Sequence, residues 1–157
     1  MIKYVNHDIV FQEFPDEVTL AVNLSLCPNG CIGCHSVFLQ ADVGEELTAE
    51  RLFSLVDDYY DEITCVGLMG GDNDFSEVQK LMAALKSRYG NKIFRGWYSG
   101  KPSLPKGMDT RLFDYVKIGP YKSDCGPLKS KTTNQRLYKV NHAEQTFEDI
   151  TSRFWKN

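Results

Sequence analysis

The sequence predicts an α/β protein, an open partial β/α barrel whose parallel sheet has its helices on the outer face. Segments with strand character alternate with helical segments along most of the chain, which is the pattern of right-handed βαβ units. The chain has 157 residues, whereas a closed eight-stranded β/α barrel needs at least about 200. We therefore expect a barrel that stays open on one side.

Composition predicts one domain, since residues 1–157 contain no internal repeat, low-complexity tract or Ser/Gly-rich linker. Hydrophobic residues make up 42% and charged residues 25%, which excludes disordered and collagen-like classes. The net charge of -3 argues against a protein that binds nucleic acid or anionic lipid non-specifically. Because the chain shows no secretory signal and no apolar run long enough to cross a bilayer, we expect a cytoplasmic protein without a membrane partner.

Strand and helix signals alternate from the first strand signal onward. Residues 18–24 are rich in β-branched and apolar side chains and lead directly into a cysteine-rich segment. Thr48 can cap a helix that reaches Tyr60, with apolar side chains at helical spacing. Residues 63–69 form a nearly continuous apolar run, which is typical of a strand covered on both faces.

The second half of the chain continues the alternation. Asp74 or Ser76 can open a helix for which Gly90 is the C-terminal stop signal. The other elements expected here are strands over residues 93–98 and 114–118, a short strand over 136–140 and a capping helix over 146–155.

Ligands of parallel α/β sheets bind beyond the carboxyl ends of the strands, because loops and helix N-termini converge there. Four predicted turns follow strand ends and should share that edge. They are the cysteine-rich loop, Gly70-Gly71-Asp72, Tyr98-Ser99-Gly100 and Gly119-Pro120-Tyr121.

Three of the five cysteines lie within eight residues, in the spacing Cys27-x3-Cys31-x2-Cys34. An odd, crowded set is a poor disulfide framework but a good metal-ligand pattern in a reducing compartment. Iron-sulfur clusters are held by such thiolates, ordinarily four. With only three thiolates in the loop, one iron would keep an open position where a ligand can be activated.

The alternative for these cysteines is a zinc site completed by Cys65, Cys125 or a histidine. His35 is an awkward fourth ligand because it directly follows Cys34. Cys65 falls inside an apolar strand, which favours a buried, inert thiol. Cys125 lies in a predicted loop, where a reactive thiol and an incidental one are equally plausible.

The cysteine loop after the first strand and the Gly-Gly-Asp turn after the second resemble the radical S-adenosylmethionine enzymes. More narrowly, the chain resembles the activating proteins of class III anaerobic ribonucleoside-triphosphate reductases. Gly33 favours the narrower assignment, since many related enzymes place an aromatic residue before the third cysteine. Four stretches support the resemblance in the expected order: Cys27 to Ser36, Met69 to Asp72, Tyr98 to Gly100, and Thr133 to Arg136.

The resemblance implies that Cys27, Cys31 and Cys34 bind a 4Fe-4S cluster whose fourth iron is chelated by S-adenosyl-L-methionine. An electron donor such as a flavodoxin-type protein would reduce the cluster, and cleavage of the cofactor would yield a 5′-deoxyadenosyl radical. The partner implied is the glycyl-radical subunit of anaerobic ribonucleoside-triphosphate reductase. The protein's own part would be to position the cofactor and exclude water.

The resemblance also implies cofactor contacts. The Gly70-Gly71-Asp72 turn would contact the methionine ammonium, and the alternative is a helix N-cap turn without a ligand. Ser36 stands where many relatives have Asn, so its polar contact to the cofactor is weakened. Ser99 would shape the adenosine side together with Tyr98, for which a structural role is an equal alternative. Lys117 would reach the cofactor carboxylate or is simply an exposed strand residue.

Residues 134–136 would pin the C-terminal segment across the open edge or touch the partner. An open half-barrel can admit a peptide loop, which fits activation of a separate reductase chain. Activation of another glycyl-radical enzyme and modification of a peptide are alternatives in the same chemical class. A zinc-bound interaction module without catalysis is the alternative from a different class.

Overall fold

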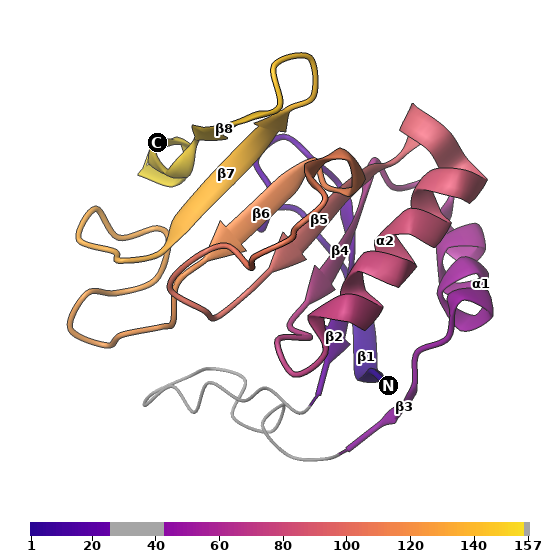
Figure 1. Ribbon diagram of the computed structural model, residues 1–157. Coiled ribbons are helices and arrows are strands. Elements are labelled where there is room, and N and C mark those ends of the chain that lie inside the picture. The colour runs from indigo at the N-terminus through magenta and orange to yellow at the C-terminus, as the bar shows by residue number, and fades with distance from the viewer. Residues whose placement is uncertain (26–42, 156–157) are drawn as a thin grey trace.

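The computed structural model describes residues 1–25 and 43–155 (Figure 1). These residues form strands, two α-helices and short 3₁₀-helices (η). In chain order they are β1 (Lys3–Val10), β2 (Thr19–Leu24), β3 (Glu45–Glu46), α1 (Ala49–Tyr59), β4 (Cys65–Met69), α2 (Phe75–Tyr89), η2 (Gly90–Lys92), β5 (Phe94–Tyr98), η3 (Thr110–Leu112), β6 (Tyr115–Ile118), β7 (Arg136–Asn141), β8 (Thr146–Asp149) and η4 (Thr151–Trp155).

The strands of the described residues form one mixed sheet in the order β3-β1-β2-β4-β5-β6-β7-β8. Its centre, β2-β4-β5-β6, is parallel, and antiparallel strands flank it on both sides. The sheet is therefore parallel only in its central half, whereas the sequence led us to expect a parallel sheet throughout. Closure into a partial barrel stays a prediction.

The register of the parallel strands aligns their carboxyl ends. Asn23 of β2 lies beside Met69 of β4, and Met69 lies beside Tyr98 of β5. Tyr98 in turn lies beside Lys117 of β6. The turns after β4, β5 and β6 consequently meet at one edge of the sheet, as the sequence predicted.

Both α-helices begin and end at the signals read from the sequence. The Thr48 side chain accepts a hydrogen bond from Arg51 N at 3.1 Å and caps α1. Asp74, rather than Ser76, caps α2 by accepting from Glu77 N at 3.2 Å. Gly90 ends α2 at φ +62°, a conformation that glycine adopts without a Cβ clash.

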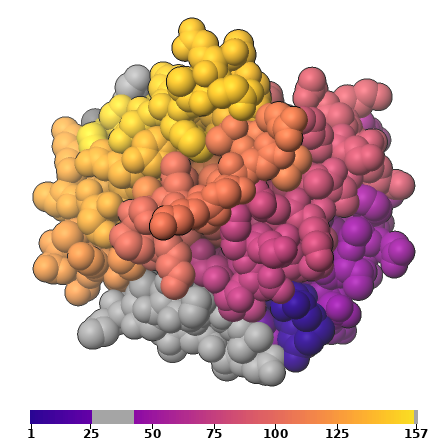
Figure 2. Space-filling model, viewed as in Figure 1, coloured from indigo at the N-terminus to yellow at the C-terminus, as the bar shows by residue number. Residues whose placement is uncertain are grey.

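Both helices cover the same face of the sheet (Figure 1). Their apolar stripes, which include Leu52, Val56, Leu81 and Leu85, pack on strand residues of the main core. In the space-filling view the segment of residues 100–112 lies against α2 across this face (Figure 2). None of the helices in the described part of the chain is long and apolar enough to cross a membrane.

The opposite face of the sheet is covered by the segment that joins β1 to β2. Its Phe14 is fully buried against Gly67 and Gly96, which are paired across β4 and β5. A Cβ at Gly96 would lie 2.3 Å from Phe14 Cζ, so only glycine leaves room for this ring. A second, smaller core of Phe14, Cys65, Tyr115, Leu137 and Ile150 results.

Two parts of the fold differ from the sequence prediction. Residues 146–155, expected as one capping helix, form β8 and then η4, because Phe147 pairs with Val140 across a hairpin. Gln145 has a φ of +56°, which is typical of such a turn and not of a helix. The strand β1 was not predicted, since its segment forms no continuous apolar run, and of its residues only Tyr4 is buried.

Candidate functional site

The four predicted residues of the cysteine segment, Cys27, Cys31, Cys34 and Ser36, lie outside the described residues. The chain enters that segment from Ser25, immediately after the carboxyl end of β2. Ser25 N donates to Lys3 O at 3.0 Å, which ties this exit point to β1. The segment therefore begins at the edge where the turns after β4, β5 and β6 meet.

The turn after β4 has the backbone that the Gly-Gly sequence suggests. Gly70 and Gly71 have φ values of +112° and +92°, a region that side chains rarely adopt. Gly70 N donates to Tyr98 O at 2.9 Å, and Gly70 O accepts from Trp97 Nε1 at 2.6 Å. A Cβ on Gly71 would lie 2.6 Å from Val78 Cγ2, so α2 packs directly on the turn.

Asp72 links the turn after β4 to the turn after β5. Its Oδ1 accepts from the Ser99 hydroxyl at 2.6 Å and its Oδ2 from Gly100 N at 2.8 Å. Ser99 is fully buried, so its hydroxyl needs this acceptor. Asp72 does not itself cap α2, because the Asp74 side chain does; the turn leads into this helix, and a turn without a ligand stays the alternative.

Lys117 is buried at the same edge, with 8% of its surface exposed. Its Nζ donates to Ser99 O and to Gly119 O, both at 3.1 Å, and lies 5.3 Å from the centre of the Tyr98 ring. The alternative of an exposed strand residue is therefore wrong. A buried ammonium costs free energy unless it is hydrogen-bonded, and these carbonyls supply part of that compensation.

Tyr98 has a structural role in the described residues. Its hydroxyl donates to Glu13 O, and its ring packs edge-on against Phe14 at 5.2 Å between ring centres. Burial raises the pKa of this phenol well above its ordinary value, so the group stays a neutral donor. Tyr98 thus fastens the segment between β1 and β2 to the sheet.

The segment before β7 is pinned to the turn after β6. Asn134 Nδ2 donates to Pro120 O at 3.0 Å, and Gln135 Nε2 donates to Gly119 O at 3.3 Å. The pinning role expected for residues 134–136 is confirmed for these two side chains. Asn134 Oδ1 is buried and has no hydrogen-bond partner in the described part of the chain. Arg136 instead lies 3.7 Å from Asp149 on β8.

The two remaining cysteines differ in burial. Cys65 is fully buried, which confirms the expected burial, and this burial raises the pKa of its thiol well above the ordinary value. Cys125 is partly exposed in a turn where its N–H donates to Lys122 O at 3.0 Å. Residues 1–25 and 43–155 contain no group of three or more His, Cys, Asp or Glu side chains that could hold a metal ion.

Two features of this edge were not foreseen. One is the hydrogen bond from the Trp97 indole, which is buried in the main core, to Gly70 O. The other is that Asn134 Oδ1 has no partner in the described part of the chain. Neither has a sequence signal, because both depend on how separate turns approach each other.

Together the described residues offer a carboxylate, a buried ammonium and turn backbone without side chains within one small region. Ser99 joins the two charges, since its hydroxyl contacts Asp72 and its carbonyl contacts Lys117. Charges of both signs match a zwitterion such as the amino-acid part of a ligand. No family model, curated protein or solved structure matches the chain.

Proposed function

We propose that this chain is an activating enzyme that reductively cleaves S-adenosyl-L-methionine at a 4Fe-4S cluster and generates a glycyl radical on anaerobic ribonucleoside-triphosphate reductase. One observation carries the proposal. The Cys27-x3-Cys31-x2-Cys34 segment follows β2 at the sheet edge where Asp72, Ser99 and Lys117 meet. Thiolate ligands and a site with both charge signs are what such a cluster and its amino-acid-bearing cofactor require.

The described residues fit the cofactor chemically. Asp72 can accept from an ammonium in addition to its contacts with Ser99 and Gly100, because a carboxylate has about four lone-pair positions. The glycines of residues 70 and 71 bring backbone close to a ligand. The buried Asn134 Oδ1, which has no hydrogen-bond partner among residues 1–25 and 43–155, is a further acceptor at this edge, suited to a ligand N–H or O–H.

When bound, the cluster and cofactor supply the one-electron chemistry that cleaves the sulfonium and produces a hydrogen-abstracting radical. The residues of the chain bind and orient. Asp72 would bind the ammonium, Lys117 would provide positive charge for the carboxylate, and Ser99, which contacts both side chains, would keep them at a fixed separation. The Trp97 contact to Gly70 O holds the turn so that the backbone does not reorganise on binding.

The substrate in this proposal is a glycine-bearing loop of a separate reductase chain. The segment holding Phe14 fills the sheet face beside Gly67 and Gly96, so a peptide would approach from the carboxyl edge. A glycine is a suitable hydrogen donor because the flanking amides stabilise its Cα radical. A flavodoxin-type protein would supply the electron, and the reaction would take place in the cytoplasm.

The deciding experiment mixes the anaerobically reconstituted chain with reductant, S-adenosylmethionine and the reductase, and records electron paramagnetic resonance. We expect an organic radical on the reductase that disappears when the acceptor glycine is replaced by alanine. Cofactor cleavage without a reductase radical would contradict this assignment and favour another glycyl-radical enzyme or a peptide substrate.

Iron loading tests the cluster separately. We expect about four irons per chain, lost in Cys27→Ala, Cys31→Ala and Cys34→Ala because each removes one thiolate. Cys65→Ala and Cys125→Ala are the matched controls and should load normally. A colourless protein that binds zinc would identify an interaction module instead, and loss of the cluster in either control would indicate a four-thiolate site.

A further inference from the structure

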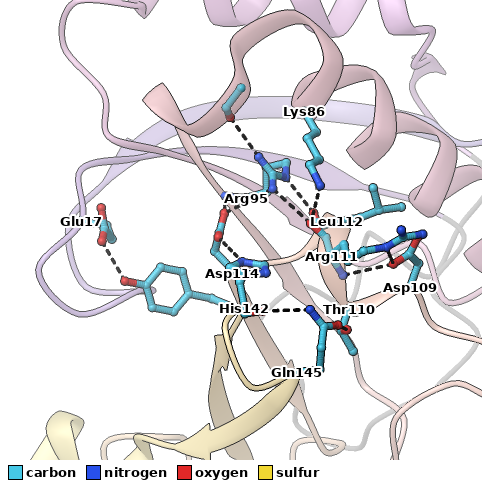
Figure 3. Close-up of polar contacts among 12 residues, drawn as sticks. Glu17, Lys86, Arg95, Asp109, Thr110, Arg111, Leu112, Asp114, His142 and Gln145 are labelled. Carbon is cyan, nitrogen blue, oxygen red and sulfur yellow. Dashed lines mark hydrogen bonds and ion pairs between the residues drawn. The ribbon is translucent and has the colours of Figure 1, made fainter.

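A cleft lies at the amino ends of β5 and β6, at the sheet edge opposite the candidate site. Figure 3 shows the polar contacts of several residues that line it, among them Lys86, Arg95 and Asp114. Its volume is about 380 Å³, within the range of small-molecule sites, which are roughly 300 to 1,000 Å³. Side chains from four separate segments line it. The polar and charged ones that matter most are Lys86, Arg95, Arg111, Asp114 and His142, and Phe94 adds an aromatic ring.

The back of the cleft is a buried arginine held in one position. Arg95 is 3% exposed, and its guanidinium donates to Leu112 O at 2.7 Å and Gly90 O at 3.2 Å. A third donation reaches Arg111 O at 3.4 Å. These bonds join the end of α2, β5 and η3 into a rigid wall that carries a fixed positive charge.

The carboxylates near the cleft are already engaged. Asp114 accepts from Arg95 N at 2.7 Å through Oδ2, and its Oδ1 lies 2.8 Å from His142 Nε2. Asp109 accepts from Arg111 Nε and Nη2 at 3.0 and 2.9 Å. The negative charges of this region are therefore directed at protein groups rather than into the cleft.

Lys86 differs from these neighbours. Its Nζ donates only weakly, to Arg111 O at 3.4 Å, and no carboxylate in the described part of the chain forms an ion pair with it. Lys86 is also exposed, so its ammonium can turn toward a ligand. The region contains three cationic side chains, Lys86, Arg95 and Arg111, and two carboxylates, Asp109 and Asp114. It is therefore net positive, although the chain has a net charge of -3.

One wall of the cleft is aromatic. Phe94 is 41% exposed although it is a large apolar residue, and its ring packs edge-on against Tyr115 at 6.2 Å between ring centres. An exposed aromatic ring beside cations suits a ligand with both an anionic group and a flat apolar part.

We propose that this cleft binds a small aromatic oxyanion, with its phosphate or carboxylate group at Lys86 and Arg111 and its ring against Phe94. Arg95 provides the positive field behind the oxyanion without moving. The site is separate from the carboxyl edge and does not depend on the function proposed above.

Calorimetric titration of the full chain with phenyl phosphate, at constant ionic strength, tests the proposal. We expect saturable binding that weakens about tenfold in Lys86→Ala, because a charge-assisted contact is lost. Lys80→Ala is the matched control, since Lys80 is also an exposed lysine of α2 but does not line the cleft. Absence of saturable binding, or equal affinities for the two variants, would overturn the proposal.

Two further variants separate the parts of the ligand. Asp109→Asn keeps a side chain able to cap η3 but removes the charge paired with Arg111, so phenyl phosphate should bind several-fold more tightly. Phe94→Ala should weaken the binding of phenyl phosphate several-fold and leave the binding of inorganic phosphate unchanged. Benzoate distinguishes the anion sources, because tighter binding of benzoate identifies a carboxylate ligand and tighter binding of phenyl phosphate a phosphate ligand. Weaker binding in Asp109→Asn would contradict the assignment of Arg111.

Discussion

The two edges of the central sheet each contain a buried cation that donates to backbone carbonyls, but they use it differently. At the amino edge, Arg95 holds three carbonyls and lies beside Asp114 at 3.8 Å. At the carboxyl edge, Lys117 donates to two carbonyls beneath turns that require glycine. Arginine has five N–H donors in a rigid plane, whereas lysine is a compact point charge. The amino edge is therefore built as a fixed support.

The carboxyl edge has features that stability alone does not explain. Gly70, Gly71 and Gly119 adopt positive φ there, and Asn134 Oδ1 is buried without a partner in the described residues. Such unsatisfied acceptors and special backbone conformations concentrate where a ligand binds. The comparison favours a supporting role for Arg95 and, under the function proposed above, a binding role for the Asp72 region.

Replacing the two buried cations gives the largest expected difference. Arg95→Met should lower the free energy of unfolding by about 3 to 5 kcal/mol, because three carbonyls lose their buried donor and Asp114 loses the nearby guanidinium charge. Lys117→Met should cost about 1 to 3 kcal/mol, since fewer carbonyls lose a donor. Urea denaturation measures both, with the exposed Lys92→Met as control. An equal or larger loss of unfolding free energy in Lys117→Met would contradict the inference that the amino edge is the main support of the fold.

Two nearby aspartates provide the next test. Asp72→Ala in the reconstituted protein should weaken S-adenosylmethionine binding roughly ten- to a hundredfold, the equivalent of about 1.5 to 3 kcal/mol for a lost charge-assisted contact. Asp74→Ala should lower stability by about 1 kcal/mol through loss of the α2 cap but leave the affinity unchanged. Unchanged affinity in Asp72→Ala would leave Asp72 only as the link between two turns.

The smallest expected effect concerns pH at the amino edge. Hydrogen bonds from the Arg111 side chain hold the pKa of Asp109 below its ordinary value. A carboxyl whose folded pKa is lowered stabilises the protein above its unfolded pKa, about 4, and loses that contribution as the pH falls through the folded value. The stability difference between the protein and Asp109→Asn should therefore be small at neutral pH and vanish in acid. Urea denaturation from neutral to acidic pH measures this stability difference. A difference that grows in acid would contradict the ion pair between Asp109 and Arg111.

Local sequence signals were sufficient to predict most of the described helices and strands between residues 18 and 141. The structure confirms the caps at Thr48 and Asp74, the helix end at Gly90 and the strand expected from the apolar run of β4. Each of these predictions depends only on residues that are close together in the sequence. The helix expected over residues 146–155 was wrong because spacing of Phe147 and Ile150 suits a helix, while pairing with β7 makes the segment a strand. Strand pairing across a hairpin overrides a weak helical pattern.

The sequence named residues of the candidate site but could not give their contacts. The sequence placed Asp72, Ser99 and Lys117 at strand ends, and the parallel register brings those ends together. It could not show that Lys117 is buried, since polar character suggests exposure until the carbonyls of residues 99 and 119 are in place. The Asp72 to Ser99 bond likewise joins residues 27 positions apart.

By itself the sequence determined where both α-helices begin and end, which turns contain glycine, and that Cys27, Cys31 and Cys34 lie close together along the chain. These properties depend on backbone conformation and on neighbours within a few residues. Only the tertiary structure decided that Phe14 fills the face over Gly67 and Gly96, and that Arg95 and Lys117 support opposite edges. Burial and hydrogen-bond partners of a side chain depend on distant segments, whose approach is set by sheet register and core packing rather than by any local pattern.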